Sequence, residues 1–294
     1  MRKKVLLIYN PKAGKTGAVQ NLSKVIQLLT EENCEVTVYP IVPDLDAEDI
    51  LEQVGENFEY VVCCGGDGTL NHAINGLMEM KKPPLLGYIP SGSTNDFAIS
   101  VGIKESLYEN CRAIAVAKPF YYDIGKFGEV YFNYIAAFGA FTEVSYSTSQ
   151  TQKNYLGHMA YIIEGMRHLP IGKSYTLKAK AQGKECEGNF IYGSVSNTTS
   201  VGGMSINKQD YVCMDDGLFE VLLIREPKNV IETQNIIAAI LLQNFDSPFI
   251  EYFQTDKISF EFSDNVPWTL DGEYGGEGTK AQISVVNKAI GLLK

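Results

Sequence analysis

The chain has 294 residues, which is long for a single domain and suits two domains that each bury a core. Hydrophobic residues make up 45% and charged residues 20% of the sequence, which is typical of a folded protein and argues against disorder. The formal net charge of -10 repels nucleic acids and anionic membranes, so no nucleic acid is expected as a partner. No apolar run is long enough for a signal peptide or a membrane span, which predicts a cytoplasmic protein.

The six cysteines show neither C-x-x-C pairs nor the spacing of a zinc site. We therefore expect small, reduced core residues. Two of them are neighbours in an expected strand and should point to opposite faces, because side chains alternate along a strand. The cysteines are Cys34, Cys63, Cys64, Cys111, Cys186 and Cys213.

The first part of the chain alternates short apolar runs with patterns of helical spacing. The apolar runs predict buried strands at residues 5–9, 35–39, 60–64 and 85–89. Helices are expected at residues 19–29, 47–54, 69–80 and 105–117. Strands that alternate with helices predict a parallel, doubly wound sheet, in which ligands bind at the carboxyl ends of the strands.

A glycine-rich motif, Gly65-Gly66-Asp67-Gly68-Thr69, joins the third strand to its helix. Glycines let the backbone approach a ligand closely, and the free N–H groups that open a helix bind anions. A carboxylate among them would repel phosphate, so Asp67 suggests a cation such as Mg²⁺, or a sugar hydroxyl, between it and the anion. The alternative is a structural turn in which Asp67 caps the helix.

Two further loops follow strands at the same expected edge of the sheet. Residues 10–17 form a basic, glycine-bearing loop, which is either a phosphate cradle or an ordinary turn with two solvated lysines; it lacks the Walker pattern. Residues 90–98 include Thr94, Asn95 and Asp96, which either bind a ligand or simply cap a helix. Ser93 lacks the context of a nucleophilic serine.

From residue 120 onward, short runs rich in aromatic and β-branched residues dominate, so we place a domain boundary near residue 122. Such a run of short strands favours an antiparallel sandwich. Helices are expected at about residues 156–168 and 229–245. Strands are expected at residues 121–124, 130–138, 175–179, 190–195, 218–224, 257–262 and 281–286.

The second half contains two acidic turns. Asp215-Asp216-Gly217 is either a cation site lined by oxygen atoms or a plain Asp-Gly turn. Asp271-Gly272-Glu273 sets two carboxylates on one side if the segment is extended, and the alternative is a surface hairpin.

Taken together and in this order, the blocks resemble the diacylglycerol kinase catalytic family, specifically the soluble bacterial lipid kinases. The resemblance covers nearly the whole chain. The matching blocks are residues 10–14 (N-P-K-A-G), 65–69 (G-G-D-G-T), 90–98, 123–125 (D-I-G), 132–133, 138–139, 157, 161, 196–197, 202–203, 215–217 and 271–273 (D-G-E). The family fold implies an NAD-kinase-like α/β nucleotide-binding domain with a mainly parallel sheet in residues 1–122. An antiparallel β-sandwich domain that binds substrate and metal would follow in residues 123–294, with the last few residues returning to the first domain.

The resemblance also implies roles for individual residues. Glu273 corresponds to the base of the family, and Asp67 and Asp96 to members of a network around Mg²⁺ and phosphate. A second, structural Mg²⁺ corresponds to Asp216 with the backbone carbonyls of Cys213 and Leu218. The nucleotide contacts correspond to Asn10, Pro11, Lys12, Ala13, Gly14, Gly66, Asp67, Gly68, Thr69 and Thr94.

The function that this family implies is an ATP- and Mg²⁺-dependent phosphotransferase that acts on a lipid hydroxyl and converts diacylglycerol to phosphatidate. An NAD kinase shares the G-G-D-G loop, but the 90–98 block and the D-G-E turn belong to the lipid-kinase pattern. A nucleotide-binding regulator without catalysis is the other alternative, against which the three acids Asp67, Asp96 and Glu273 argue.

A lipid substrate implies a transient, peripheral contact with the membrane surface. Arg167, Lys173, Lys178, Lys180 and Lys184 cluster in the sequence and are either a membrane-facing patch or an ordinary solvated face. The sequence leaves the acyl chains and the oligomeric state open, and a homodimer is compatible with it.

Overall fold

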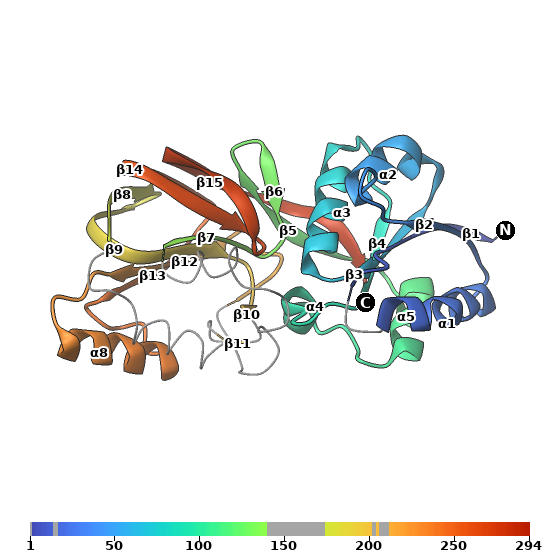
Figure 1. Ribbon diagram of the computed structural model, residues 1–294, viewed down its shortest axis with the longest axis horizontal. Coiled ribbons are helices and arrows are strands. Elements are labelled where there is room, and N and C mark those ends of the chain that lie inside the picture. Colours follow the sequence, from blue (N-terminus) through green and yellow to red (C-terminus); the bar gives the residue numbers. More distant parts are fainter. Residues whose placement is uncertain (1, 14–16, 140–173, 202–203, 206–211) are drawn as a thin grey trace. The chain divides into compact units, whose positions relative to one another are not determined.

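The computed structural model describes residues 2–13, 17–139, 174–201, 204–205 and 212–294 (Figure 1). The chain divides into two compact units, residues 1–124 with 287–294 (unit 1) and residues 125–286 (unit 2). The strands β5 (Phe120–Phe127) and β15 (Glu273–Leu293) each contribute residues to both units. In the described part of the chain, no helix is long and apolar enough to cross a membrane.

Unit 1 is built on a parallel sheet. Its strands are β1 (Lys3–Tyr9), β2 (Cys34–Pro40), β3 (Tyr60–Gly65) and β4 (Leu85–Pro90), in the order β4-β3-β1-β2. All three pairings between them are parallel, and the end of β15 adds a further parallel pair beside β4. The centres of β1, β3 and β4 are buried, as expected for strands covered on both faces.

Five α-helices in the described part of unit 1 connect and cover these strands. The helices are α1 (Gly17–Glu31), α2 (Ala47–Val54), α3 (Asp67–Glu79), α4 (Asp96–Val101) and α5 (Leu107–Val116). Figure 1 shows α2 and α3 together on one face of the sheet, and α1 and α5 together on the other face. The parallel α/β arrangement and all four strands predicted for this part of the chain are therefore confirmed.

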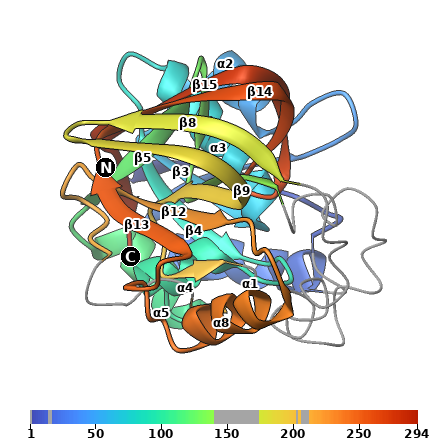
Figure 2. The ribbon, with the colours of Figure 1, turned by 90° about the vertical axis from the view of Figure 1, so that its left-hand side faces the viewer.

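Unit 2 is antiparallel throughout its described strand pairs. Its long strands are β9 (Lys184–Ser196) and β14 (Lys257–Leu270), and between them lie β8 (Tyr175–Ala181) and β7 (Ile135–Gly139) one after the other. The remaining elements are β6 (Val130–Phe132), β10 (Ser200–Val201), β11 (Met204–Ser205), β12 (Phe219–Arg225), β13 (Ile250–Thr255) and the helix α8 (Val230–Leu241). Figure 2 shows β14, β8, β9, β12 and β13 in this order across the sheet.

An aromatic core holds the sheet of unit 2 together. Phe138 and Trp268 lie with ring centroids 4.8 Å apart, and Phe260 and Phe262 pack around Trp268. Strands β6, β7, β8, β9, β12, β14 and β15 all contribute buried side chains to this one core. The strands expected to form a sandwich are thus hydrogen-bonded into one sheet, and seven of them share one core.

Several elements differ from the sequence-based expectation. The strand expected at residues 130–138 is interrupted, because Asn133 and Tyr134 donate their backbone N–H groups to a distant carboxylate instead of to a neighbouring strand. Strand β13 was not predicted, and α8 ends at Leu241. The helix expected at residues 156–168 lies outside the described residues.

All six cysteines are free thiols, as predicted. Five are buried, but Cys213 is exposed, so the expectation of a core residue is wrong there. Cys213 lies in the acidic turn before β12, where the chain runs over the surface.

Candidate active site

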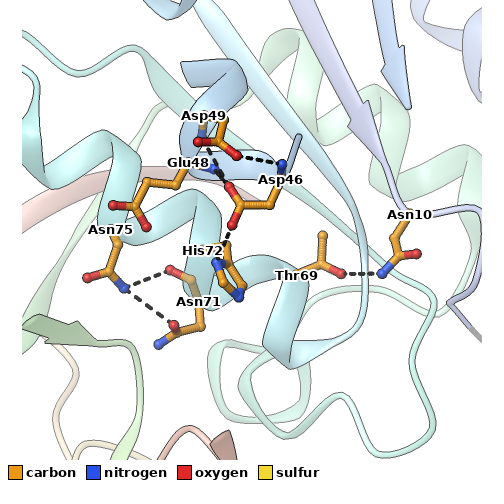
Figure 3. A network of polar contacts seen from close by, with 8 residues as sticks. All are labelled: Asn10, Asp46, Glu48, Asp49, Thr69, Asn71, His72 and Asn75. Atoms are coloured by element: carbon orange, nitrogen blue, oxygen red, sulfur yellow. Dashed lines mark hydrogen bonds and ion pairs between the residues drawn. The ribbon is translucent and has the colours of Figure 1, made fainter. Parts of the chain in front are cut away.

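Three loops meet at the carboxyl edge of the sheet in unit 1. The N–H group of Asn10, just after β1, donates to the carbonyl of Cys64 at 3.0 Å, and the N–H group of Ser91, just after β4, donates to the carbonyl of Gly65 at 2.8 Å. The Asn10 side chain then reaches the first turn of α3, where its Nδ2 donates to Oγ1 of Thr69 at 3.0 Å (Figure 3). The predicted phosphate loops are therefore hydrogen-bonded to one another.

Asn10 also organises its own loop. Its Oδ1 accepts the N–H group of Lys12 at 2.9 Å, and its carbonyl accepts the N–H group of Ala13 at 3.1 Å. Pro11 and Lys12 are exposed in the resulting turn. Gly14 was also predicted to contact the nucleotide, but it lies outside the described residues.

The glycines of this edge are needed for packing. A Cβ atom on Gly92 would lie 2.7 Å from the Cα of Gly66, and one on Gly65 would lie 2.5 Å from the Cβ of Thr69. Real Cβ atoms do not come so close to other atoms, so a side chain at Gly92 would push the two loops apart, and one at Gly65 would displace the Thr69 side chain of its own motif. The loop after β4 and the loop after β3 are thus in backbone contact.

Asp67 is the first residue of α3, and Gly66 is the N-cap. The alternative in which Asp67 caps the helix is therefore wrong. Its Oδ2 instead accepts hydrogen bonds from Oγ1 of Thr94 and from the N–H group of Asp96, both at 3.3 Å. The structure thus brings together Asp67, Thr94 and Asp96, three of the residues predicted from the sequence.

The segment that carries Asp96 is held in an unusual backbone conformation. Asn95 has φ 53, in the left-handed region, which asparagine tolerates better than most residues. Its side chain accepts the N–H group of Gly92 at 2.8 Å and donates to the carbonyl of Gly92 at 3.2 Å. Asp96 opens α4 with only 1% of its surface exposed. Asp67 and Asp96 are therefore both the first residues of helices, where the helix dipole favours negative charge.

Two other groups near this edge are chemically inert. The Tyr88 hydroxyl donates to the carbonyl of Gly65 at 3.2 Å, and burial, with a further contribution from the charge of Asp67, raises the pKa of this phenol well above its usual value. Burial likewise raises the pKa of the Cys63 thiol. Neither group forms an anionic nucleophile near neutral pH.

A second polar cluster joins α2 to α3 (Figure 3). Asp46 is the N-cap of α2, and its Oδ1 accepts the N–H groups of Glu48 at 2.8 Å and Asp49 at 3.0 Å. Its Oδ2 lies 3.0 Å from Nδ1 of His72, one turn into α3. Neither Asp46 nor His72 was predicted from the sequence as a site residue. Asp46 stands three residues before Asp49, as in a capping box, but no pattern in the sequence links Asp46 to His72.

The D-G-E motif forms a tight hairpin turn between β14 and β15 in unit 2. Asp271 (φ 51) and Gly272 (φ 87) both have positive φ, as in a type I′ turn, and Leu270 pairs with Glu273. The hairpin alternative is therefore correct, and the interpretation as an extended segment with both acids on one side is wrong. Asp271 is buried, whereas Glu273 is exposed.

The acidic turn before β12 adopts ordinary turn geometry. Oδ1 of Asp216, which is exposed, accepts the N–H group of Leu218 at 2.9 Å. The carbonyl of Met214 accepts a hydrogen bond from Asn197 at 3.4 Å. Within the described ranges, no group of three or more His, Cys, Asp or Glu side chains could hold a metal ion. The ligand set of Asp216, Cys213 and Leu218 depends on backbone carbonyls and stays a prediction.

A buried acid that the sequence analysis missed follows this turn. Glu220 is 1% exposed, and burial raises the pKa of its carboxyl to about 7. Its Oε1 accepts from Nε2 of Gln254 at 3.0 Å, and its Oε2 has no hydrogen-bond partner in the described part of the chain. The alternation of β12, which places Phe219 and Val221 in the core, puts Glu220 on the opposite face.

The cationic residues predicted as a possible patch are largely neutralised where the structure describes them. Lys178 pairs with Glu185 and Glu187, and Lys184 lies 3.1 Å from a carboxylate oxygen of Glu251. Arg167 and Lys173 lie outside the described residues. Lys178 and Lys184 are therefore paired with carboxylates, and the membrane-facing patch stays a prediction.

Comparisons with known proteins point to one family. The family model of the diacylglycerol kinase catalytic domain matches residues 4–127. The diacylglycerol kinase of Bacillus subtilis (strain 168) is 30% identical over 93% of this chain and 91% of its own length, and that of Staphylococcus carnosus (strain TM300) is 30% identical over 94% and 90%. A solved structure of a diacylglycerol kinase from Bacillus anthracis str. Sterne covers 99% of this chain with 96% of its own, at 22% identity and a TM-score of 0.82. Another solved chain from that organism has a TM-score of 0.86 at 24% identity, over the same 99% and 96%.

Proposed function

Because this chain belongs to the diacylglycerol kinase family, we propose that it transfers the γ-phosphoryl group of ATP to the free hydroxyl of diacylglycerol and so forms phosphatidate. The observation that carries the proposal is the contact of Asp67 with Thr94 and Asp96 at the edge of the sheet where the glycine-rich loops meet. Phosphoryl transfer needs positioning, charge neutralisation and a group to accept the proton of the attacking hydroxyl.

The groups at this edge fit a metal-bound triphosphate. The carboxylates of Asp67 and Asp96, with the hydroxyl of Thr94, are oxygen donors of the kind that Mg²⁺ prefers. The amide groups that open α3 offer sites for phosphate oxygens. A Mg²⁺ held by these oxygen donors would neutralise the charge that develops on the phosphates during transfer. The residues we assign to nucleotide binding are Asn10, Pro11, Lys12, Ala13, Gly14, Gly66, Asp67, Gly68, Thr69 and Thr94.

Glu273 is the proposed base. An exposed carboxylate at the start of a strand is accessible to an alcohol, and it can accept the proton only from a hydroxyl within hydrogen-bond reach. We propose that unit 1 is the nucleotide-binding domain and that unit 2 is the domain for substrate and metal.

We further propose a structural Mg²⁺ at the acidic turn before β12, held by Asp216 and by the carbonyls of Cys213 and Leu218. The hydrogen bond from the Leu218 N–H group to Asp216 supports this, because it fixes the carboxylate beside its own turn. An ion there would stabilise unit 2 and would take no part in the chemistry.

The substrate is a membrane lipid, so the proposed enzyme is a cytoplasmic protein that makes peripheral, transient contact with the membrane surface. The ion pairs of Lys178 and Lys184 argue against a purely electrostatic contact through these residues. The net charge of -10 repels anionic lipid, so contact with such a membrane requires a local attraction.

The test is an assay with radiolabelled ATP in which diacylglycerol, sphingosine, NAD or no acceptor is supplied. We expect label only with diacylglycerol, and we expect it in phosphatidate, resolved by thin-layer separation. Label in NADP would favour the NAD kinase alternative. A protein that binds ATP but labels no acceptor would favour the regulator without catalysis.

A further inference from the structure

Asp271 is a buried carboxylate that receives a row of backbone hydrogen bonds. It lies at the turn between β14 and β15 with only 4% of its surface exposed. The N–H group of Asn133 donates to its Oδ2 at 2.6 Å, and those of Tyr134 and Ile135 donate to its Oδ1 at 2.9 and 3.0 Å. Three consecutive amides, those of the two residues between β6 and β7 and that of the first residue of β7, therefore point at one side chain.

A carboxylate is suited to this position for a chemical reason. It presents only acceptor atoms, whereas an amide or a protonated acid would turn a donor toward at least one of the N–H groups. Hydrogen bonds to a charged acceptor are stronger than those between neutral groups, and buried N–H groups left without an acceptor are costly. The contact therefore ties the turn firmly to the preceding strands of unit 2.

The backbone at the turn is fixed from the same side. The N–H group of Asp271 donates to the carbonyl of Ile135 at 2.8 Å, and the Thr269 hydroxyl donates to the carbonyl of Ala137 at 3.2 Å. Leu270 and Ala136 pair directly across β14 and β7. The turn is thus held by both main-chain and side-chain hydrogen bonds to a single segment.

Glu273, two residues later, has a different environment. Its carboxylate is exposed, and no hydrogen bond or ion pair to another described residue restrains it. Its location therefore depends on the backbone of the turn, since its own side chain makes no restraining contact. A base must be held close to its productive position, and a displacement of about 1 Å can reduce turnover about 100-fold.

We propose that Asp271 is a positioning residue for Glu273, and that its three backbone hydrogen bonds hold the turn in the geometry that proton abstraction requires. This inference rests on the proposed function, in which Glu273 is the base. Asp271 does not itself touch the reacting atoms. It acts through the turn, because its φ of 51 and the positive φ of Gly272 place Glu273 at the first pair of the hairpin.

The variants that test this must separate the anchor from backbone strain. Asp271→Gly removes the carboxylate, and glycine adopts positive φ without cost, so any loss of turnover reflects the missing hydrogen bonds to the carboxylate. Asp271→Asn also tolerates positive φ and keeps one acceptor oxygen. Glu277→Gln is the matched control, because Glu277 is an exposed acid on the same strand.

A double-mutant cycle with Glu273→Gln distinguishes positioning from general stabilisation. We expect Asp271→Gly to lower kcat about 100-fold in the wild-type background, with the KM for ATP changed less than about twofold. In the Glu273→Gln background the same change should lower kcat less than about threefold, because the base to be positioned is already gone. Asp271→Asn should lose less, about tenfold, and Glu277→Gln should match the wild type.

Equal losses in both backgrounds would show that Asp271 is merely structural and would overturn the proposal, as would an unchanged kcat for Asp271→Gly. If turnover in the Glu273→Gln background is too slow to measure, or if Asp271→Gly does not fold, the kcat of Asp271→Asn tests the proposal. A lowered kcat with unchanged KM for ATP supports positioning, and unchanged kcat contradicts it. Normal turnover of Glu273→Gln would refute the base itself, a result distinct from equal losses.

Discussion

Gly92→Ala probes the contact between the two loops that form the proposed nucleotide site. The new Cβ would lie 2.7 Å from the Cα of Gly66 and 2.9 Å from Oδ1 of Asn95, whereas carbon atoms prefer separations of about 3.5–4.0 Å. The loops must therefore separate by about 1 Å, at a cost of about 1–3 kcal/mol for overpacking. If the loops relax in the free protein and must close again around ATP, that cost falls on binding, and it corresponds to about 5–150-fold weaker affinity.

The assay is calorimetric titration with ATP and Mg²⁺, together with turnover on diacylglycerol. Gly278→Ala is the matched control, since the nearest atom to its Cβ would be the Lys280 carbonyl oxygen at 3.6 Å, an ordinary contact. We expect the Gly92 variant to bind ATP at least about tenfold more weakly and the control to bind it normally. Affinity and turnover of Gly92→Ala within about twofold of the wild type would show that loop packing does not shape this site.

Two further predictions concern unit 2 and the thiols. Asp216→Ala should lower the melting temperature in Mg²⁺ and abolish the shift that a chelator causes in the wild type, because a Mg²⁺ concentration of 100 times Kd stabilises the site by about 2.7 kcal/mol. Asp264→Ala, at an exposed acid, should retain that shift. Identical melting of the wild type with and without chelator would count against the ion. At pH 8 a thiol reagent should modify Cys213 before the other cysteines of the folded protein, because Cys213 is exposed whereas the other five thiols are buried, and burial raises the pKa of Cys111 to about 11. In denaturant all six cysteines should react. Rapid loss of two or more thiols from the folded protein would contradict the buried assignments.

Local patterns were sufficient for the parallel part of the fold. The spacing of apolar residues predicted α2 at 47–54, the bounds found in the structure, because helix spacing and an N-cap acid agree there. The glycine-rich motif was correctly placed between a strand and a helix. The alternation of strands and helices also indicated that Asp67 and Asp96 lie at one edge of the sheet, because the loops after parallel strands share that edge.

Long-range contacts explain what the sequence could not reveal. The hydrogen bonds from Asn133 and Tyr134 to Asp271 join residues more than a hundred positions apart, and they interrupt a stretch whose alternation reads as one strand. The pairing of His72 with Asp46 likewise depends on two helices packing together. Glu220 was hidden because an acid within an apolar strand ordinarily indicates a solvated face, whereas here that face is covered.

Whether Glu273 is the base is tested by comparing lipid phosphorylation with nucleotide binding in Glu273→Gln. We predict that the variant binds ATP and Mg²⁺ with wild-type affinity, melts normally, and transfers label to diacylglycerol at least about 100-fold more slowly than the wild type. Phosphatidate formation at a rate close to that of the wild type, with ATP binding unchanged, would contradict the account.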